Sequence, residues 1–483
     1  MSRVLPPPEK PFDLVTDIVV IGAGACGLIA GLRALEAGAE VIVLERDATP
    51  SGSTALSSGF VPAPATRFQR ALGLEDSAGQ FALDIQNKAK GGAEAGLVEL
   101  VSMRIGPALE WLADMHGIDW VVLDDFLYTG HSAHRMHAVP ERTGAALMGR
   151  LLAAAEAAGL TLVASAPVTA LFADATGRIA GVEITRPDGR TETVGCRALV
   201  LACNGYGGNA SLLAEHIPEM QDALYFGHAG NRGDAVIWGR ALGAALKDLT
   251  AYQGHGSVAH PHGILITWAL MMQGGIQVNA NGLRFSDEHG GYSEQAVHVL
   301  AQPGGIAWNI FDAPLHQLGL GFADYREAEK AGAVLTARTL EDLAQTCGLP
   351  AAALERTLAE CLAAKTGGPA DPIGRDFSDW RPLEAPFHAV RVTGALFHTQ
   401  GGLRIDCATR VLRADGSPLP NLYAAGGAAC GVSGARVEGY LSGNGLLTAI
   451  GLGFVAGREA ALGALTGPGP QASAASRNGH REL

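Results

Sequence analysis

The feature that most constrains the fold of this chain is the stretch DIVVIGAGACGLIAGLRALEAGAEVIVLER, residues 17–46. It reads as a short β-branched strand, a turn with the pattern G-x-G-x-x-G at Gly22, Gly24 and Gly27, a helix that ends at a glycine, and a second apolar strand. Glu45 closes the second strand. These parts follow one another in the order of a dinucleotide-binding βαβ unit, so we expect a parallel sheet with a helix packed on it.

Each part of this unit has a task in binding a nucleotide. One glycine makes the tight turn, one lets backbone N–H groups approach a pyrophosphate, and one lets the helix pack closely on the strand. The N-terminus of the helix faces the anionic phosphates, and Glu45 is placed to accept hydrogen bonds from ribose hydroxyls. The alternative is a turn that serves packing only, but the two strands and the terminal acid favour nucleotide binding.

Composition and charge narrow the class of protein. A chain of 483 residues is long enough for two or three domains, and 65 glycines suit an α/β enzyme with many tight turns. The net charge of −13 at pH 7 argues against nucleic acid and anionic membranes as partners. The seven cysteines are scattered without a C-x-x-C pair, the N-terminus has no apolar signal core, and no uninterrupted apolar run reaches transmembrane length. We therefore expect a cytoplasmic protein without a transmembrane segment.

The composition and the periodicity of the sequence change along the chain, and these changes predict interleaved domains. Residues 12–250 hold the βαβ unit, helices with leucine periodicity, and short strands joined by glycine-containing turns. Residues 251–388 lack a second nucleotide motif and include helices rich in Ala and Glu, which is typical of an inserted domain. Residues 389–465 return to glycine-rich strands and a final apolar helix. The tail, 466–483, is expected to be disordered.

Segments spread over nearly the whole chain resemble one flavoprotein family. After the βαβ unit they are, in chain order, GSTALSSG, ALVLACNGYGGN, NRGDAVIWGRALGA, GGIQVNANGLRFSDE, FHTQGGLRID, and PLPNLYAAGG through GYLSGNGL. In this order they resemble the fumarate reductase and succinate dehydrogenase flavoprotein family, which also contains the 3-ketosteroid dehydrogenases and tricarballylate dehydrogenase. The set is far more specific than any one of its members.

The resemblance implies an α/β fold, with a Rossmann-like FAD-binding domain built from both chain ends and an α+β cap domain inserted between them. It implies FAD as the cofactor and hydride transfer between flavin N5 and a substrate carbon–carbon bond. Family members with covalent flavin carry a histidine in the loop that reads GSTALSS here, so FAD is expected to be non-covalent. The positions implied to contact FAD are Gly22, Gly24, Ala25, Gly27, Glu45, Arg46, Ser53, Thr54, Ser58, Gly59, Val168, Asn204, Gly205, Gly426, Asn444, Gly445 and Leu446.

One departure from the family pattern concerns the proton donor. Fumarate reductases place an arginine eight residues before the asparagine of V-N-x-x-G-x-R-F, and counting back from Asn279 gives Met271. The surrounding run ILITWALMM offers no cation for a dicarboxylate. The run also fits a core segment of the cap domain, but under either interpretation the missing arginine argues against fumarate reduction by the family's usual route.

Two histidines fall in segments where similar fumarate reductases hold a substrate carboxylate. They are His255 in YQGH and His398 in FHTQGG. Histidine is also a general acid or base near neutral pH, and a purely structural role is the alternative for each. Tyr252, His255 and Tyr292 are all candidates for the base that takes the substrate's α-proton, and the sequence does not choose among them.

The last matching segment points to the substrate. Fumarate reductases have an arginine two residues before G-G-N, whereas this chain has Tyr440 in GYLSGNGL. A tyrosine at this place resembles the ketosteroid dehydrogenases, and Tyr-x-Ser is similar to their Δ4-(5α) branch. The Tyr440 hydroxyl and a backbone N–H at the helix start, such as that of Asn444, would stabilise an enolate-like oxyanion. The alternatives are a tyrosine packed at the helix start, and a carboxylate site at Arg436 and Glu438.

A histidine-rich stretch, GHSAHRMH, belongs to none of the matching segments. His131, His134 and His137 follow an i, i+3, i+6 spacing, and Asp124 and Asp125 lie upstream. This spacing is irregular for metal ligands, and the resembled family carries no metal. We expect a solvated loop and no metal site.

The sequence therefore predicts an FAD-dependent oxidoreductase that acts on CH–CH groups. The leading hypothesis is α,β-desaturation of a cyclic or steroid-like ketone, with Tyr440 polarising the carbonyl. One alternative is a dehydrogenase or reductase of a small carboxylic acid, tricarballylate- or fumarate-like, held by Arg436, His255 and His398. Another is a flavin-binding protein that has lost catalysis. The chain has no C-x-x-C-H for haem and no second Rossmann unit for NAD, so reoxidation requires an external acceptor such as a quinone, a carrier, oxygen or another protein.

Overall fold

The chain forms two compact units and passes between them more than once. The computed structural model describes residues 3–467. The first unit comprises the chain up to Leu212, Gly227–Ala251 and the chain from His398 onward, and the second unit comprises Leu213–Phe226 and Tyr252–Phe397. The tail expected to be disordered, 466–483, lies outside the described residues except for its first two.

A nine-stranded sheet forms the base of the first unit. Its strands are, in sheet order, β1 (Arg3–Leu5), β8 (Val168–Ala173), β9 (Ile179–Thr185), β10 (Thr191–Leu201), β2 (Leu14–Ile21), β3 (Val41–Leu44) and β7 (Thr161–Val163), with β21 (Pro418–Ala424) beside β10 and β20 (Arg410–Leu412) beside β21. β2 pairs in parallel with β3 and with β10, so that Ile21 lies beside both Leu44 and Leu201. Three carboxyl ends therefore meet at one edge, which is where ligands bind in open α/β sheets.

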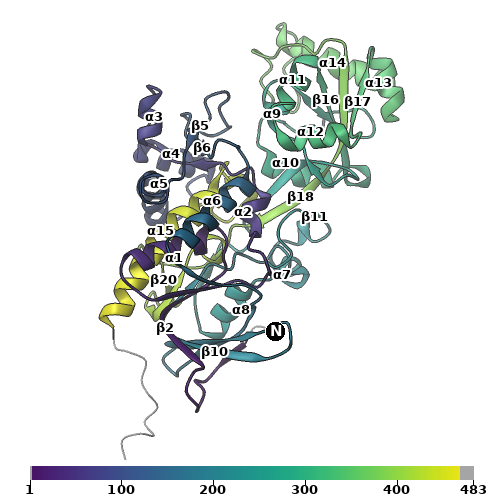
Figure 1. Ribbon diagram of the computed structural model, residues 1–483. Helices are drawn as coiled ribbons and strands as arrows, with labels where there is room; N and C mark the ends of the chain where they lie inside the picture. The colour runs from purple at the N-terminus through teal and green to yellow at the C-terminus, as the bar shows by residue number, and fades with distance from the viewer. Residues whose placement is uncertain (1–2, 468–483) are drawn as a thin grey trace, which may run out of the picture. The chain divides into compact units, whose positions relative to one another are not determined.

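Helices from distant parts of the chain complete the first unit (Figure 1). They are α1 (Ala25–Glu36), α2 (Gly52–Leu56), α3 (Arg67–Ala71), α4 (Ala78–Lys88), α5 (Ala95–His116), α6 (Gly144–Ala157), α8 (Asp234–Ala241) and α15 (Asn444–Thr466), and α7 (Ala210–His216) crosses into the second unit. Short strands form two further sheets, one of β4 (Val61–Pro62), β6 (Met136–Ala138) and β5 (Val121–Val122), and one of β12 (Leu246–Lys247) and β19 (Gly402–Leu403). The α/β class expected from the sequence is confirmed.

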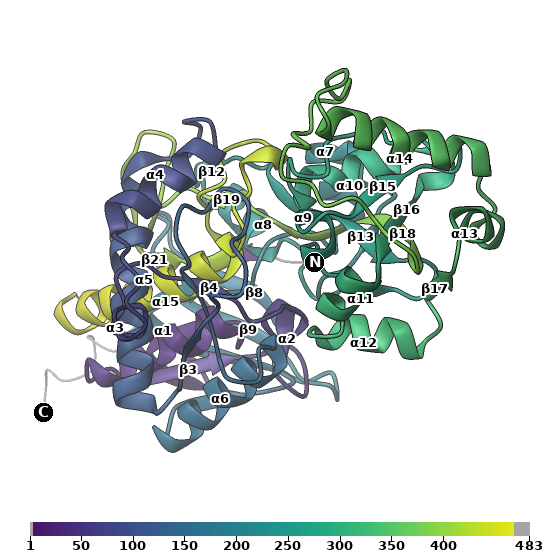
Figure 2. The same cartoon turned by 90° about the horizontal axis from the view of Figure 1, so that it is seen from above.

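The helices α1 and α15 come from opposite ends of the chain and pack directly on each other (Figure 2). A Cβ atom at Gly453 would come within 2.7 Å of the Cys26 carbonyl oxygen, and a Cβ at Gly457 would come within 2.8 Å of the Ala30 carbonyl carbon. Cβ atoms do not approach a backbone this closely, so the two glycines allow the two helices to touch.

The apolar helix α15 is a core helix of the first unit. By length and composition it is the one helix of the described chain that would suit a membrane span, with a mean hydropathy of 1.3 in its most apolar window. However, 61% of that window is buried inside the protein. This burial explains the apolar composition, because a helix covered on most sides has to be apolar on most sides.

The second unit has its own seven-stranded sheet and its own apolar clusters. Its strands are β14 (Ile264–Leu265), β13 (Tyr252–Ala259), β18 (Phe387–Thr399), β16 (Ile306–Asp312) and β15 (Ile276–Val278), with β11 (Leu224–Tyr225) and β17 (Val334–Ala337) beside β18. Its helices are α9 (Ala269–Met272), α10 (Tyr292–Leu300), α11 (Ala313–Gly319), α12 (Ala323–Lys330), α13 (Leu340–Cys347) and α14 (Ala351–Lys365).

The boundaries of the second unit differ from those expected for the inserted domain. The expected return to the first domain, at residue 389, falls inside β18. β18 pairs with β16 from Phe387 to Thr393, and the second unit continues to Phe397 because the strand is not interrupted. Leu213–Phe226 also joins the second unit, where β11 pairs with β18.

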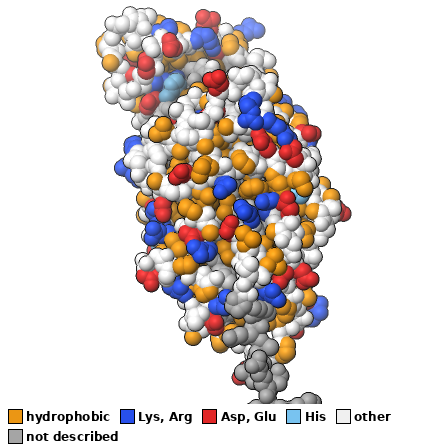
Figure 3. Space-filling view, turned by 90° about the vertical axis from the view of Figure 1, so that its left-hand side faces the viewer, with side chains coloured by type: hydrophobic (Ala, Val, Ile, Leu, Met, Phe, Trp, Pro, Cys, Tyr) orange, Lys and Arg blue, Asp and Glu red, His pale blue; other side chains and the backbone are white. Residues whose placement is uncertain are grey.

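Charged side chains of both signs are mixed on the surface. Figure 3 shows Lys and Arg interspersed with Asp and Glu over the face that it displays. The net charge of −13 is therefore not gathered into one acidic patch on that face.

The contact between α1 and α15 gives a first testable prediction. Gly457→Ala should lower the free energy of unfolding by about 2 kcal/mol, because the new methyl group meets the backbone of α1 at Ala30. Gly149→Ala is the matched control: Gly149 is exposed in α6, and a Cβ added there would have no neighbouring atom within 4 Å, so the change should stabilise by about 0.5–1 kcal/mol. Thermal unfolding midpoints of both variants check this, and equal shifts would contradict it.

Candidate functional site

The turn after β2 is shaped so that only glycine fits at its critical positions. Gly22 has a φ of +103°, and a Cβ there would lie 2.5 Å from the Ala202 carbonyl oxygen. A Cβ at Gly27 would collide with the Gly22 carbonyl group. α1 begins at Ala25 with no side-chain cap at Gly24. The first turn of α1 is therefore a backbone cradle of the kind that holds a pyrophosphate.

Glu45 stands beside this turn at the carboxyl end of β3. Its side chain is only 8% exposed. Oε2 accepts a hydrogen bond from the Ala23 N–H at 2.8 Å, and Oε1 accepts one from the Asp47 N–H at 3.0 Å. Because a carboxylate has about four acceptor positions, these two bonds fix Glu45 and leave acceptor capacity for the hydroxyls of a ribose.

Ser53 and Thr54 in α2 have different partners. Thr54 Oγ1 accepts a hydrogen bond from the Ala25 N–H at 3.1 Å and so ties α2 to the start of α1. Ser53 Oγ accepts from Asn204 Nδ2 at 3.0 Å and from Asn231 Nδ2 at 2.9 Å. A hydroxyl that accepts twice keeps its own hydrogen for a ligand acceptor. Asn204 has a φ of +63°, a left-handed backbone conformation that is uncommon for residues other than glycine. The direction of its side chain follows from this conformation.

The end of β3 is linked to the segment that carries α8. Arg46 pairs with Asp234 at 2.5 Å, and His228 pairs with Asp47 at 2.9 Å. Asn231 and Asp234 were not selected from the sequence, although both lie in the matching segment NRGDAVIWGRALGA. The resemblance of this segment to the family could have identified both residues, because no role had been assigned to its polar side chains.

The remaining positions implied to contact FAD are spread over the first unit. A Cβ at Gly59 would lie 2.8 Å from the Thr143 carbonyl oxygen, and Gly426 (φ +59°) lies against the Cys26 side chain at the start of α1. Val168 begins β8, and Gly205 follows Asn204 after β10. Ser58 is partly buried after α2, and Gly445 and Leu446 lie in the first turn of α15.

A line of polar side chains runs from the start of α15 to His398. Asn444 Nδ2 donates to Ser433 Oγ at 3.0 Å, and the Ser433 hydroxyl donates to Gln400 Oε1 at 2.9 Å. Gln400 Nε2 then donates to His398 Nδ1 at 2.9 Å. His398 Nδ1 also lies 3.4 Å from the Thr399 carbonyl oxygen, so two neighbours hold the ring at this nitrogen.

His398 and Tyr440 lie together at the start of α15. Their ring centroids are 5.7 Å apart at an interplanar angle of 75°, and Tyr440 is only 5% exposed. A Cβ at Gly445 would lie 2.8 Å from His398 Nε2, so the imidazole rests against the first turn of the helix. Burial lowers the pKa of His398 to about 4. At pH 7 this histidine is therefore neutral and brings no positive charge to the start of α15.

His255, in the second unit, is also a buried and neutral imidazole. The Ser257 N–H donates to His255 Nδ1 at 3.1 Å, so the proton of the neutral ring is on Nε2. The ring stacks on Tyr292 at 4.9 Å and on Phe397 at 5.3 Å, and burial lowers its pKa to about 3. His255 is thus a neutral donor in an aromatic setting, and it is poorly suited to accept a proton.

The positions that bear on a charged substrate contain no buried cation. Met271 is fully buried in the apolar core of the second unit, where Trp268 is also found. Arg436 has a side chain that is 72% exposed and pairs with Glu438 at 3.5 Å. Of the two tyrosines among the candidate bases, Tyr252 is buried at the start of β13, and Tyr292 begins α10.

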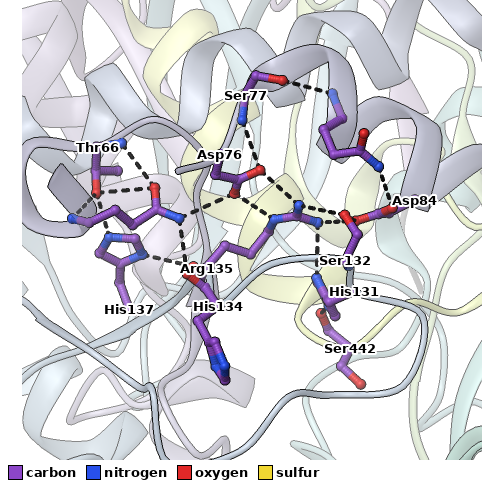
Figure 4. Close-up of polar contacts among 12 residues, drawn as sticks. Thr66, Asp76, Ser77, Asp84, His131, Ser132, His134, Arg135, His137 and Ser442 are labelled. Carbon is purple, nitrogen blue, oxygen red and sulfur yellow. Dashed lines mark hydrogen bonds and ion pairs between the residues drawn. The ribbon is translucent and has the colours of Figure 1, made fainter. Parts of the chain in front are cut away.

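The expectation of a solvated loop at the histidine-rich stretch is wrong. His131 is 6% exposed and His137 is fully buried. Figure 4 shows the polar contacts around them. His137 Nδ1 donates to the Arg135 carbonyl oxygen at 2.8 Å, and its Nε2 lies 2.8 Å from Thr66 Oγ1. Burial lowers the pKa of both histidines to about 4. The spacing within the stretch gave no sign of this, because the polar partners come from other parts of the chain. Within residues 3–467, no group of three or more candidate ligands could hold a metal ion.

Comparison with known proteins relates this geometry to a family. Residues 17–446 match a family model described as an FAD binding domain. A probable fumarate reductase of Shewanella frigidimarina is 29% identical over 459 residues, which cover 93% of this chain and 75% of the relative. The solved open conformation of a flavocytochrome c3 fumarate reductase superimposes with a TM-score of 0.80 at 28% identity and covers 94% of this chain and 79% of the other. The 3-ketosteroid-Δ4-(5α)-dehydrogenase from Rhodococcus jostii gives a TM-score of 0.74 at 26% identity and covers 96% and 99%.

The geometry at Glu45 gives a second prediction. Glu45→Gln should weaken FAD binding by about tenfold or more, because the ribose hydroxyls lose a charged acceptor and the amide NH2 cannot accept from the Ala23 or the Asp47 N–H. The Kd is measured by titrating the flavin-free protein with FAD and following the quenching of flavin fluorescence. Glu40→Gln, at an exposed glutamate just before β3, is the control and should bind FAD as the wild type does. Equal affinity of all three proteins would contradict the role of Glu45.

Proposed function

This chain belongs to the FAD binding domain family and is an FAD-dependent oxidoreductase, and on that premise we propose that it desaturates the α,β carbon–carbon bond of a cyclic or steroid-like ketone. The glycine turn, the fixed carboxylate of Glu45 and the doubly bonded hydroxyl of Ser53 fit the phosphates, ribose and polar edges of FAD. The loop at residues 51–60 contains no histidine, which supports non-covalent attachment.

The observation that carries the proposal is the grouping of Tyr440, His398 and the start of α15. α15 is a 23-residue helix whose N-cap, Gly443, provides no side-chain hydrogen bond. The Asn444 N–H donates to the Leu441 carbonyl oxygen at 3.0 Å, so it is not the oxyanion donor that the sequence suggested. The positive end of the helix dipole and the next N–H groups of α15 favour negative charge at this place. A substrate carbonyl held here would accept the Tyr440 O–H as its oxygen becomes an enolate-like oxyanion.

Residues of the chain can then be assigned to the breaking of the two substrate bonds, Cα–H and Cβ–H. A base takes the α-proton, and the electron pair of the broken Cα–H bond forms the new double bond as the β-hydride leaves. His255 is a poor candidate for this base because its Nδ1 already accepts from Ser257 and its Nε2 carries the proton. Tyr252 and Tyr292 therefore stay as the candidates. FAD, when bound, supplies the hydride acceptor at N5.

The charges of the site support an uncharged substrate. His398 is neutral at pH 7, and Arg436 is exposed and paired with Glu438. At the position where the family resemblance implies an arginine, the sequence has Met271. A carboxylate held here would have the N-terminus of α15 beside it but no paired cation to offset its lost hydration. The similarity in fold and sequence to a 3-ketosteroid dehydrogenase supports the same class of substrate.

Two further proposals concern the setting of the reaction. The seven cysteines of the chain are free thiols in the structure, which supports a reducing compartment such as the cytoplasm. The electrons leave to an external acceptor such as a quinone, a diffusible carrier or oxygen, since the motif for NAD occurs once in the sequence and is used for FAD.

Replacement of Tyr440 tests the proposed function. Tyr440→Phe should lower the rate of flavin reduction by cyclic ketones and ketosteroids by about 10²- to 10³-fold, because one oxyanion donor is lost, while FAD content is unchanged. Anaerobic stopped-flow absorbance of the bound flavin measures the rate. Tyr423→Phe, at a buried tyrosine of β21, is the matched control and should react as the wild type does. A Tyr440→Phe variant with the wild-type rate would refute the assignment.

A second candidate function is reduction or dehydrogenation of a small carboxylic acid. The observation that favours it is the 29% identity to a relative named as a probable fumarate reductase. In this case Arg436, His255 and His398 would hold the carboxylates.

Replacement of Arg436 separates the two functions. Under the ketone proposal Arg436→Ala should change kcat/KM for ketones by less than about twofold, because the side chain is exposed and paired. Under the acid alternative it should weaken binding of fumarate or tricarballylate by about tenfold or more. Arg190→Ala is the matched control, since Arg190 is also 72% exposed and pairs with a nearby acid, Asp188. A tenfold loss with Arg436→Ala alone would favour the acid substrate.

A further inference from the structure

A buried ionic cluster lies beneath the segment that carries Tyr440 (Figure 4). Its centre is Arg135, whose side chain is fully buried between Asp76 and Asp84. Arg135 Nε donates to Asp76 Oδ2 at 2.8 Å, and Nη2 donates to Asp76 Oδ1 at 2.9 Å. Nη1 donates to Asp84 Oδ2, which also accepts from the Ser132 hydroxyl at 2.7 Å. The guanidinium is thus locked in one orientation.

The same guanidinium reaches a histidine with its remaining hydrogens. Nη1 donates to His131 Nδ1 at 3.3 Å, and Nη2 donates to Ser132 Oγ at 3.4 Å. All five N–H bonds of Arg135 therefore have an acceptor. The Arg135 guanidinium also lies over the Phe81 ring at 4.6 Å, and the His131 ring stacks on the same phenyl ring. Packing and hydrogen bonds together restrain both side chains.

The contact with Arg135 decides where His131 carries its proton. A guanidinium donates and never accepts, so His131 Nδ1 has to accept and the neutral ring is protonated on Nε2. Nε2 lies 3.0 Å from the carbonyl oxygen of Ser442, which is an acceptor. The two contacts agree on one tautomer, and this tautomer donates to the backbone of Ser442. Burial and the positive charge of Arg135 lower the pKa of His131 to about 4, so the tautomer persists at neutral pH.

Ser442 stands between the two parts of the proposed oxyanion site. Tyr440 lies two residues before it, and Gly443, the N-cap of α15, directly follows it with a φ of +88°. A Cβ at Gly443 would lie 2.5 Å from the Pro62 ring, and one at Gly130 would lie 2.9 Å from Leu441, so the segment is closely surrounded. A shift of the Ser442 carbonyl would move both the tyrosine and the first N–H groups of the helix.

We propose that Arg135 and His131 are positioning residues for the oxyanion site: Arg135 fixes the Nε2–H tautomer of His131, and His131 holds the Ser442 carbonyl so that Tyr440 and the start of α15 are aligned. The assignment of an effect on catalysis rests on the proposed function. The mechanical part of the proposal, that His131 orders residues 440–446, does not rest on the proposed function. Neither residue touches the substrate or the cofactor in this role.

A pair of His131 variants tests the mechanical part. In His131→Gln the amide Nε2 is as many bonds from the backbone as the imidazole Nε2, so the donor to Ser442 is kept. In His131→Leu the size is kept and the donor is lost. Hydrogen–deuterium exchange of peptides covering residues 440–446 in the FAD-loaded protein should be about tenfold faster in His131→Leu and within about threefold of wild type in His131→Gln. Unchanged exchange in His131→Leu would overturn the proposal.

Kinetics of the same variants test the effect on catalysis. With a ketone that reduces the wild-type flavin, His131→Leu should lower kcat by about tenfold with little change in KM, because the misaligned donors act mainly in the transition state. His131→Gln should restore most of the rate. If no ketone reduces the wild-type flavin, the proposed function fails, and the exchange experiment still decides the mechanical part. Faster exchange in His131→Leu with an unchanged kcat would refute the link to catalysis.

The tautomer offers a test that does not depend on the folding of His131→Leu. In protein labelled with ¹⁵N at histidine, the imidazole signals of His131 are identified by their absence from His131→Gln. Their ¹⁵N shifts should show a proton on Nε2 and none on Nδ1 between pH 6 and 8, as the contact with Arg135 requires. A proton on Nδ1 would overturn the proposal, because His131 would then be unable to donate to Ser442.

Discussion

Close contact between α1 and α15 is the interaction on which the rest of the first unit depends. Gly453 and Gly457 lie directly on the backbone of α1 at Cys26 and Ala30, a spacing that side chains at these positions would prevent. α1 carries the glycine turn at its start, and α15 begins a few residues after Tyr440. One helix contact therefore fixes the nucleotide cradle and the proposed oxyanion site in the same rigid unit, although they come from opposite ends of the chain.

The buried histidines act as neutral hydrogen-bonding groups rather than as cations. His131 accepts from Arg135 and His255 accepts from the Ser257 backbone, each at Nδ1, which leaves the proton on Nε2. Burial lowers the pKa of these two rings and of His398, so that all three stay neutral. Neutral donors stabilise charge that develops during a reaction and do not attract an already charged substrate, which is the physical basis for preferring a ketone.

The buried cluster of Asp76, Arg135 and Asp84 illustrates how a costly interaction serves orientation. Removing three charges from water costs several kcal/mol each, and the mutual attraction returns this only where every donor and acceptor is paired. Arg135 meets this condition with all five N–H bonds. An apolar cluster of the same size would stabilise the fold as well, but it would leave the tautomer of His131 undefined. We regard the defined tautomer of His131 as the contribution of this cluster to the protein.

The sequence by itself determined the βαβ unit, the α/β class and the family, because strand, turn and helix signals act over a few residues and their order survives in the linear pattern. It also pointed to Glu45 and Tyr440 as single residues of interest. The tertiary structure decided the rest. GHSAHRMH reads as a polar loop until Asp76, Asp84, Thr66 and Ser442 surround it, and the unbroken course of β18 sets the limit of the second unit. The burial of a polar side chain depends on partners far away in the chain, and local spacing carries no record of them.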